Sequence, residues 1–395
     1  MTMKAIGGSM TKLACVVLVI LVNQICFASI PGVTDSEIVI GAHTAESGWA
    51  PYVAMPAAMT AYFEKLNAAG GIFGRKVKFN RIDCQADALK VVQATKKLVE
   101  EDGVFALVGA VGPTHQGVYR SLQEKGVPDM FIMDGLSEYT NPAKKWIFQG
   151  ILPWAREGKI FGDLAVKKFK GKRACLLVGD NAVGEEFLKG AKGAIEEGNA
   201  SLKDGEKVVI GLVERVDKKA PQVNAEVLKL KKDGCDLVLT SLYARVTPTV
   251  LSYAASQSFK PTFMVTAWNV STDFLAILPE SVRDGVIAEA NFAFADELGG
   301  KVSGFAQYKS LMKEHNITLG QLSGQGYAVA EMFAEVLKRA GKDLSREKLV
   351  EAAESLKNWK CSICFDSVNM SATNHVATTS AQLIVSKSGK WVSLE

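Results

Sequence analysis

The segment FALVGAVGPTHQGVYRSLQEKGVPDMFIMDGLSEYT, residues 105–140, decides the fold of this chain. It holds two short apolar runs, residues 105–108 and 129–133, and each run ends at a glycine-containing loop. Runs of this length and composition are typical of buried strands. The residues between them, about 114–124, have the pattern of a helix with Thr114 as its N-cap. The segment therefore predicts two successive strand–loop–helix units, as in a parallel α/β sheet.

The two loops of this segment are predicted to bind an anionic group. The first carries Gly112, Pro113 and Thr114, and the second carries Gly135 and Ser137. Loops at the carboxyl ends of neighbouring parallel strands meet at one edge of the sheet, and backbone N–H groups at a helix start have no partner inside the helix. Such a crevice holds an anion without a cationic side chain. The alternative is that these residues are ordinary turn glycines and a helix cap.

The rest of the chain repeats the alternation of strands and helices. Further strands are expected at residues 36–42, 76–82, 146–149, 173–178, 208–213, 236–240 and 261–265. Helices are expected at residues 51–69, 87–101, 157–169, 185–197, 224–232, 247–257, 302–313, 325–340 and 346–355. A hairpin of residues 376–385 and 391–394 closes the chain. Because 395 residues exceed what one core usually accommodates, we expect an α/β fold with two doubly wound, Rossmann-like lobes.

Each lobe is expected to combine two stretches of the chain. Residues 36–150 and 292–370 are assigned to the first lobe, and residues 151–291 and 371–395 to the second. Three crossings would then join the lobes, near residues 149–152, 289–292 and 367–373.

The first residues have the pattern of a secretory signal peptide. Lys4 and Lys12 precede the apolar run 13–22, and Ala28 ends a group of small residues, so residues 1–28 are predicted to be removed. A lipoprotein with acylated Cys26 is the weaker alternative. Loss of the two lysines lowers the formal charge from +4 to +2, and a near-neutral exported protein is not expected to bind nucleic acid.

Five cysteines remain once the signal peptide is removed. An odd number leaves at least one free thiol or an intermolecular bridge. Cys361 and Cys364 are expected to form a local disulfide or to be two buried thiols, because no second pair of ligands completes a zinc site. Cys175 and Cys235 each begin a predicted strand of one lobe, so a bridge between them stays open at this point.

The chain resembles the periplasmic branched-chain amino-acid (leucine/isoleucine/valine) binding proteins of ABC transporters, the type I solute-binding proteins. The resemblance runs from about Glu37 to the C-terminus and is carried by IVIGAHTAESG (38–48), LNAAGGIFGRKV (66–77), LVGAVGPT (107–114), TNPAKKWIFQG (140–150), GDNAVGEEF (179–187) and NHVATTSAQLIVSKSGKWV (374–392). The resemblance implies two lobes that close on a small ligand about a hinge.

In proteins of that family the first lobe holds the ligand carboxylate, and the matching residues here are Gly112, Pro113, Thr114, Gly135 and Ser137. The family also places aromatic side chains over the ligand. Tyr243 matches the one on the second lobe, and Trp49 or Tyr52 would serve on the first. Tyr243, Trp49 and Trp268 have the alternative of packing in the protein core.

One position departs from the amino-acid binders. They place a carboxylate after the strand that ends at Met264, to pair with the ligand ammonium, whereas this chain has Ala267 there and Trp268 beside it. An unpaired, desolvated ammonium costs several kcal/mol. Either another acid substitutes, with Glu46, Asp134 and Asp180 as candidates, or the ligand lacks an α-ammonium. In the second case Trp49 and Trp268 would suit a flat or aromatic carboxylate.

The expected function is extracytoplasmic ligand binding for an ABC uptake transporter. The ligand would be an apolar amino acid or, as the alternative, a carboxylate without the amine; a periplasmic sensor subunit is the other alternative. No dinucleotide-binding GxGxxG, zinc-hydrolase or GxSxG pattern is found in the sequence, so no enzyme activity, metal or cofactor is predicted. The expected partners are the ligand and a membrane permease, the chain is expected to be a monomer, and its predicted location is the periplasm.

Overall fold

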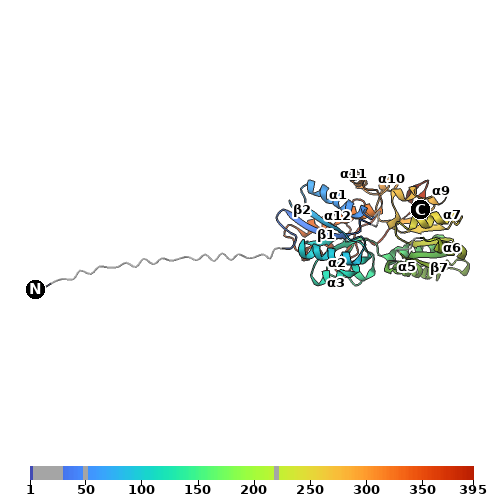
Figure 1. The fold of residues 1–395 in the computed structure, drawn as a ribbon, viewed down its shortest axis with the longest axis horizontal. Coiled ribbons are helices and arrows are strands. Elements are labelled where there is room, and N and C mark those ends of the chain that lie inside the picture. Colours follow the sequence, from blue (N-terminus) through green and yellow to red (C-terminus); the bar gives the residue numbers. More distant parts are fainter. Residues whose placement is uncertain (3–29, 48–51, 218–221) are drawn as a thin grey trace.

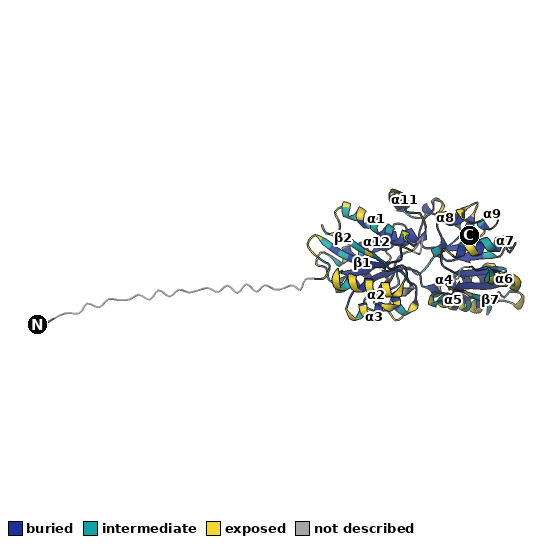
Figure 2. Ribbon diagram, in the orientation of Figure 1, coloured by how far each residue is buried: buried dark blue, intermediate teal, exposed yellow. Residues whose placement is uncertain are grey.

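The computed structural model describes residues 1–2, 30–47, 52–217 and 222–395. Residues 3–28 of the predicted signal peptide, including Cys26, and Trp49 lie outside the described residues. The described chain forms two α/β lobes, each built around its own sheet (Figure 1). Buried residues concentrate in the strands and in the helix faces turned toward them (Figure 2). The predicted fold class, two doubly wound lobes, is confirmed.

The first sheet has the strand order β2-β1-β3-β4-β5, and all its neighbouring strands are parallel. Its strands are β1 (Glu37–Thr44), β2 (Lys76–Asp83), β3 (Ala106–Val108), β4 (Asp129–Ile132) and β5 (Ile147–Gln149). Ile40 and Val108 face a core shared with α1 (Ala54–Ala68), α12 (Gln321–Ala340) and α13 (Arg346–Glu354). Leu107 faces the opposite core, with α2 (Ala88–Lys96) and α3 (Tyr119–Glu124). The alternation of strand side chains therefore buries both faces.

The second sheet has the order β12-β11-β10-β9-β8-β6-β7. Its strands are β6 (Arg173–Gly179), β7 (Val209–Val216), β8 (Leu237–Ser241), β9 (Thr262–Val265), β10 (Ile287–Ala290), β11 (Gln382–Lys387) and β12 (Lys390–Ser393). Among these pairs, β10–β11 and the C-terminal hairpin β11–β12 are antiparallel, and the others are parallel. One face packs on α4 (Trp154–Lys168) and α5 (Ala182–Asn199). The other face packs on α6 (Asn224–Asp233), α7 (Thr247–Ser256), α8 (Thr272–Ala276), α9 (Glu280–Arg283) and α10 (Asp296–Gly299), while α11 (Phe305–Glu314) contacts α1.

Several helix ends follow from local side-chain chemistry. The Asp87 carboxylate accepts hydrogen bonds from Leu89 N and Lys90 N at the start of α2. The Asn181 side chain likewise accepts one from Gly184 N at the start of α5. Gly234 ends α6 with φ 71°, a left-handed conformation that glycine adopts without strain.

The prediction of one continuous helix at residues 114–124 is wrong. The chain instead forms a short 3₁₀ helix, η2 (Pro113–Gly117), and then α3, which begins at Tyr119. Gly112, with φ 96° and ψ 164°, precedes η2, so Thr114 lies inside a 3₁₀ helix and is not an N-cap. Proline fixes the first residue of the turn, and Gly117 interrupts the apolar pattern that a continuous helix needs.

Two further elements differ from the expectation. β10 is a fully buried strand where only a crossing near residues 289–292 was expected. α12 begins at Gln321, four residues before the predicted start at 325. Although α12 is 20 residues long, no helix of the described chain is long and apolar enough to cross a membrane.

The chain returns to the second sheet close to its C-terminus. Val376 pairs with Gln149 at the edge of the first sheet, and Ala377 N donates a hydrogen bond to Gln149 O. β11 then pairs with β10 in the second sheet, so this passage lies between Ala377 and Gln382. The expected passage was at residues 367–373, a stretch in which Val368 and Met370 pack in the core of the first lobe.

Two disulfides join four of the described cysteines. Cys175 and Cys235 are bridged across a sequence separation of 60, which settles the pairing that the sequence left open. Cys361 and Cys364 form the local disulfide that was one of the two expected states. Cys84 is buried with a free thiol.

Candidate functional site

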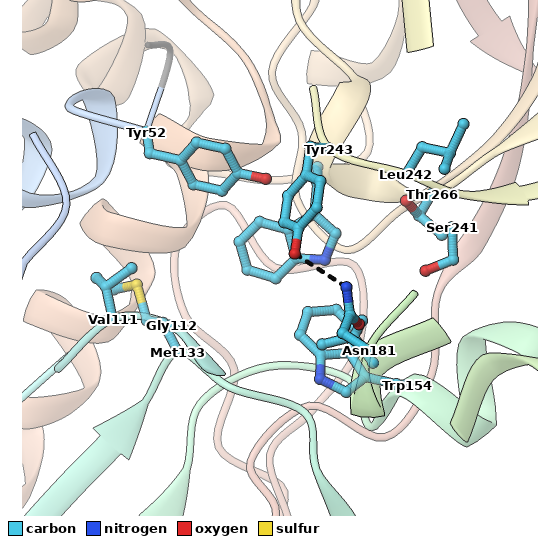
Figure 3. A pocket seen from close by; sticks show the side chains of 12 residues that line it. Tyr52, Val111, Gly112, Met133, Trp154, Asn181, Ser241, Leu242, Tyr243 and Thr266 are labelled. Carbon is cyan, nitrogen blue, oxygen red and sulfur yellow. Dashed lines mark hydrogen bonds between the residues drawn. The ribbon is translucent and has the colours of Figure 1, made fainter. Parts of the chain in front are cut away.

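A cavity of about 60 Å³ lies between the two lobes. This is several times the roughly 10–15 Å³ that one water needs, so a ligand of several heavy atoms fits. The lining combines residues of both lobes, Tyr52, Val111, Gly112, Met133, Trp154, Asn181, Val183, Ser241, Leu242, Tyr243, Thr266 and Trp268. Figure 3 shows Tyr52 and Tyr243 facing each other across it. The cavity lies where strands of both sheets end, the usual place of ligand sites in open α/β sheets.

The first-lobe wall is formed by the loop after β3. Val111 N donates to His43 O at 3.2 Å, and Met133 N donates to Ala110 O at 2.8 Å, so this loop is tied to its neighbours on both sides. Gly112 then leads directly into η2. Gly112 lines the cavity, so the backbone at the start of η2 lies beside it.

A buried polar chain fixes η2 to the sheet beneath it. His115 Nδ1 lies 2.8 Å from His43 Nε2, and His115 Nε2 lies 2.5 Å from Asp129 Oδ2. Burial by itself lowers the pKa of His115, but the Asp129 carboxylate beside it raises that pKa above its ordinary value. Burial, and then the neighbouring His115, lower the pKa of His43. His115 therefore positions the loop and does not line the cavity.

The second-lobe wall comes from loops that follow β6, β8 and β9. The Asn181 side-chain amide donates to the Tyr243 hydroxyl at 2.9 Å, which orients both side chains at the cavity (Figure 3). Ser241 ends β8, Leu242 follows it, and Thr266 follows β9. Hydroxyl and amide groups thus lie among apolar side chains on this wall. Such a lining suits a ligand with an apolar body and few polar atoms.

Three aromatic side chains form the floor of the cavity. The rings of Tyr52 and Trp268 stack with centroids 6.0 Å apart, and those of Trp154 and Trp268 are 5.2 Å apart. Trp154 Nε1 donates to Asp134 Oδ1 at 3.1 Å. Trp268 Nε1 is buried without a hydrogen-bond partner among the described residues. The Trp154 indole is therefore held by a hydrogen bond, whereas the Trp268 indole is held by ring contacts.

Of the predicted site residues, Tyr52, Gly112, Tyr243 and Trp268 meet at the cavity. Pro113 and Thr114 follow Gly112 in η2, so their backbone lies beside it. Gly135 lies behind Trp154, where a Cβ would come within 2.7 Å of the indole, and it is not a lining residue. Ligand contact by Pro113, Thr114, Gly135, Ser137 and Trp49 stays a prediction.

Ser137 binds a carboxylate of the protein itself. Its N–H donates to Glu186 Oε1 at 2.9 Å, and its hydroxyl donates to the same oxygen at 2.5 Å. Ser137 belongs to the first lobe and Glu186 to α5 of the second, so these hydrogen bonds join the lobes beside the cavity. Ser137 thus has a carboxylate partner within the protein, and its contact with a ligand carboxylate stays a prediction.

Glu186→Gln is expected to weaken ligand affinity about fivefold. The contact stabilises the arrangement in which both lobes line one cavity, and a hydrogen bond to a charged group at an exposed site contributes about 1 kcal/mol. Isothermal titration of the variant and of Ser137→Ala measures the effect. Because both variants weaken the same contact, the affinity lost by their double variant should be smaller than the sum of the two single losses; additive losses would contradict the role given to this pair.

The carboxylates proposed as substitutes for Ala267 lie elsewhere. Asp134 is fully buried and accepts hydrogen bonds from Trp154 Nε1, Leu136 N and the Tyr139 hydroxyl. Burial raises the pKa of Asp134. Glu46 accepts from the Thr44 hydroxyl at 2.9 Å and lies close to Arg81. Neither residue is part of the cavity lining, nor is Asp180, and the described lining is apolar, aromatic, hydroxyl or amide in character.

A pair of buried carboxyls lies behind Trp268. Glu157 of α4 and Glu289 of β10 are hydrogen-bonded to each other, and Glu289 Oε1 also accepts from Ala267 N at 3.2 Å. Burial, and then the charge of Glu289, raise the pKa of Glu157, while burial raises the pKa of Glu289 to about 7. At least one of the two carboxyls therefore keeps its proton at neutral pH.

Sequence reasoning missed several of the lining residues. Trp154 lines the cavity, although its place next to the first expected crossing favours packing at the hinge. Val111, Met133, Asn181, Ser241, Leu242 and Thr266 were not singled out either. Each of these six lies at or just beyond the end of a predicted strand, and that position is the signal that could have found them.

The chain matches the family model described as "Periplasmic binding protein" over residues 37–390. No curated protein matches it. Its fold is similar to a branched-chain amino-acid ABC transporter structure from Thermus thermophilus with bound valine, at TM-score 0.81 and 15% identity, covering 92% of this chain and 96% of that one.

Two further solved structures are similar at low identity. A fatty acid ABC transporter substrate-binding protein from Thermomonospora curvata has TM-score 0.78 and 20% identity over 92% of this chain and 93% of that one. A branched-chain amino-acid transporter substrate-binding protein from Streptococcus pneumoniae, in complex with isoleucine, has TM-score 0.76 and 17% identity over 90% and 98%. These likenesses show the fold, and the family match extends over most of the sequence. The chain therefore belongs to the periplasmic binding protein family.

Proposed function

We propose that this protein is the extracytoplasmic substrate-binding component of an ABC uptake transporter, and that its ligand is a small carboxylate with an apolar body and no α-ammonium group. The observation that carries the proposal is the cavity between the lobes, with Gly112 and the start of η2 on one wall and aromatic rings on its floor. The η2 backbone would bind the carboxylate, and Tyr52, Tyr243 and Trp268 would enclose the apolar body.

The character of the lining favours a ligand without an amine. Ala267 stands at the position where the resemblance expects an acid, and it is 7% exposed. The nearby Glu289 carboxyl is directed to the Ala267 backbone and to Glu157. A ligand ammonium in this cavity would lose its water without gaining a carboxylate partner from the described lining, which costs several kcal/mol.

An amino-acid ligand is the second candidate. It is favoured by the similar structures whose titles give bound valine and bound isoleucine. The similar fatty acid transporter protein favours the first candidate. In either case we propose cleavage after Ala28, action in the periplasm as a monomer, and recognition of the closed lobes by a membrane permease.

A thermal-shift screen of refolded protein, residues 29–395, separates the two candidates. Its ligands form matched pairs that differ only in the amine: valine and 3-methylbutanoate, leucine and 4-methylpentanoate, phenylalanine and 3-phenylpropanoate. At one hundred times its dissociation constant a ligand stabilises by about 2.7 kcal/mol. We expect the acid of at least one pair to raise the melting temperature and its amino acid not to. A shift confined to amino acids would establish the second candidate, and no shift from any pair would contradict both.

Tyr243→Ala is expected to weaken binding of the acid about tenfold. The substitution removes ring contact with the ligand and the acceptor of the Asn181 hydrogen bond, together about 1–2 kcal/mol. Tyr243→Phe is the matched control, because it keeps the ring and loses only the hydroxyl, and it should retain most of the affinity. An unchanged dissociation constant in Tyr243→Ala would remove this side chain from the binding site.

A further inference from the structure

Trp268 forms a wall shared by three hollows of the protein. It lines the central cavity and also an outer cavity of about 390 Å³. A small polar niche of about 10 Å³, lined in part by Glu157, Gln321 and Gln325, touches the same side chain. The outer cavity is thus much larger than the central one, and Trp268 is the lining residue that the two have in common.

Three chain segments line both cavities, each with residues that are close together in the sequence. Tyr52 lines the central cavity, and Ala54 lines the outer one. On the second lobe, Tyr243 lines the central cavity and the next residue, Ala244, lines the outer one. On either side of Trp268 in the sequence, Thr266 lines the central cavity and Asn269 lines the outer one. The two cavities are therefore adjacent compartments of one interlobe space.

The Trp268 indole is held in this wall by ring contacts. It lies against Tyr52 and Trp154, and its buried Nε1–H has no acceptor among the described residues. An unpaired buried donor costs free energy, so rotation of the ring toward an acceptor is not opposed by the loss of a hydrogen bond. Trp268 is suited to act as a movable partition.

The outer cavity suits an apolar chain. Most of its inner wall is hydrocarbon, from Ala54, Ala244, Pro248, Val270, Phe274 and Leu322. Its charged residues, Arg245 and Asp273, are exposed and lie toward solvent. Asp273 accepts a hydrogen bond from the Thr318 hydroxyl at 3.0 Å. A methylene chain that entered from the central cavity would meet apolar surface first and charge only at the outer rim.

We propose that the outer cavity is a second subsite of the same ligand site, which receives the hydrocarbon tail of elongated monocarboxylates, and that Trp268 determines how long a ligand the site accepts. This inference rests on the proposed function, because the carboxylate end is held at η2. The tail passes Trp268 as the ring turns aside, and each methylene buried beyond it contributes to affinity. The ligand class is therefore straight-chain or aryl-alkyl monocarboxylates, longer than the central cavity alone holds.

Isothermal titration of straight-chain acids from butanoate to dodecanoate tests this inference on the refolded protein. Burying one methylene should tighten binding about fourfold, so affinity should rise with chain length past the size of the central cavity. Ala54→Phe narrows the outer cavity and leaves the central lining unchanged. This variant should abolish the gain in affinity that long acids obtain from added methylenes, and it should leave the affinity for short acids unchanged. Trp268→Ala should weaken the binding of short acids, because they lose the contact with the ring. Long acids should keep their affinity.

Trp146→Ala is the matched control for loss of a tryptophan, because Trp146 lines neither cavity. It should leave the length profile of the wild type unchanged. The inference is overturned if short acids bind while affinity falls with every added methylene, or if Ala54→Phe affects all lengths equally; the proposed function survives either result. If acids of every length fail to bind, the proposed function fails with it.

Discussion

Replacing Cys175 and Cys235 with alanine is expected to lower the free energy of unfolding by about 4 kcal/mol. The bridge closes a loop of 60 residues, so its loss restores a large conformational entropy to the unfolded chain. The two residues also join β6 to the start of β8, neighbouring strands of the second sheet beside its edge strand β7. Urea denaturation followed by circular dichroism measures the loss.

The second disulfide provides the matched control. Cys361 and Cys364 are separated by only 3 residues, so the loop that they close is short and its entropy is small. Their double replacement with alanine should cost well under half as much as that of the long-range bridge. Equal losses, or no loss on replacing Cys175 and Cys235, would show that loop closure is not what stabilises the second lobe.

Glu289→Gln is expected to stabilise the protein by about 3 kcal/mol at pH 8 and to leave its stability at pH 4 almost unchanged. Burial raises the pKa of Glu289 from 4.5 to about 7. Above pH 4.5 the unfolded chain releases this proton while the folded chain retains it, so the wild type loses stability as the pH rises toward 7. Glutamine keeps the acceptor for Ala267 N and carries no ionisable proton, so the variant avoids that loss.

Denaturation curves between pH 4 and pH 8 measure this difference. Glu196→Gln is the control, since Glu196 is an exposed glutamate of α5 and its change should leave the pH dependence as it is in the wild type. Glu157→Gln should act in the same direction as Glu289→Gln, because burial raises the pKa of Glu157 as well. A variant Glu289→Gln that is less stable than the wild type at pH 8 would contradict the view that an ionised carboxyl is unfavourable there.

The elements of the two lobes that could be predicted from the sequence are those with short apolar runs that end at glycine. β3, β4 and most helices between strands follow from such local patterns and lie within a few residues of the expected positions; the helix expected at residues 114–124 is the exception. β10 was missed because its sequence, IAEA, contains Glu289, and a glutamate in a fully buried strand is unusual unless it has a partner. That partner, Glu157, is distant in the sequence, so local pattern carried no sign of the pair.

A site residue could be predicted from the sequence where it lies in a loop that directly follows a strand. Gly112, Tyr243 and Trp268 follow strand ends, and the structure brings them to one cavity. Trp154 became a lining residue through the packing of one lobe against the other, which no local pattern encodes, whereas Asn181 is marked by its place just beyond a strand end. The role of Ser137 depends on Glu186, a contact between lobes that only the folded arrangement reveals.

Isothermal titration of the refolded protein with 4-methylpentanoate and with leucine tests the central claim most directly. The two ligands share their carboxylate and hydrocarbon body and differ only in the α-amine. If the interlobe cavity selects an apolar carboxylate, 4-methylpentanoate should bind at least about tenfold more tightly than leucine, a difference of about 1.4 kcal/mol that reflects the unpaired ammonium. Tighter binding of leucine would contradict the account and would require an acidic partner for the ligand amine.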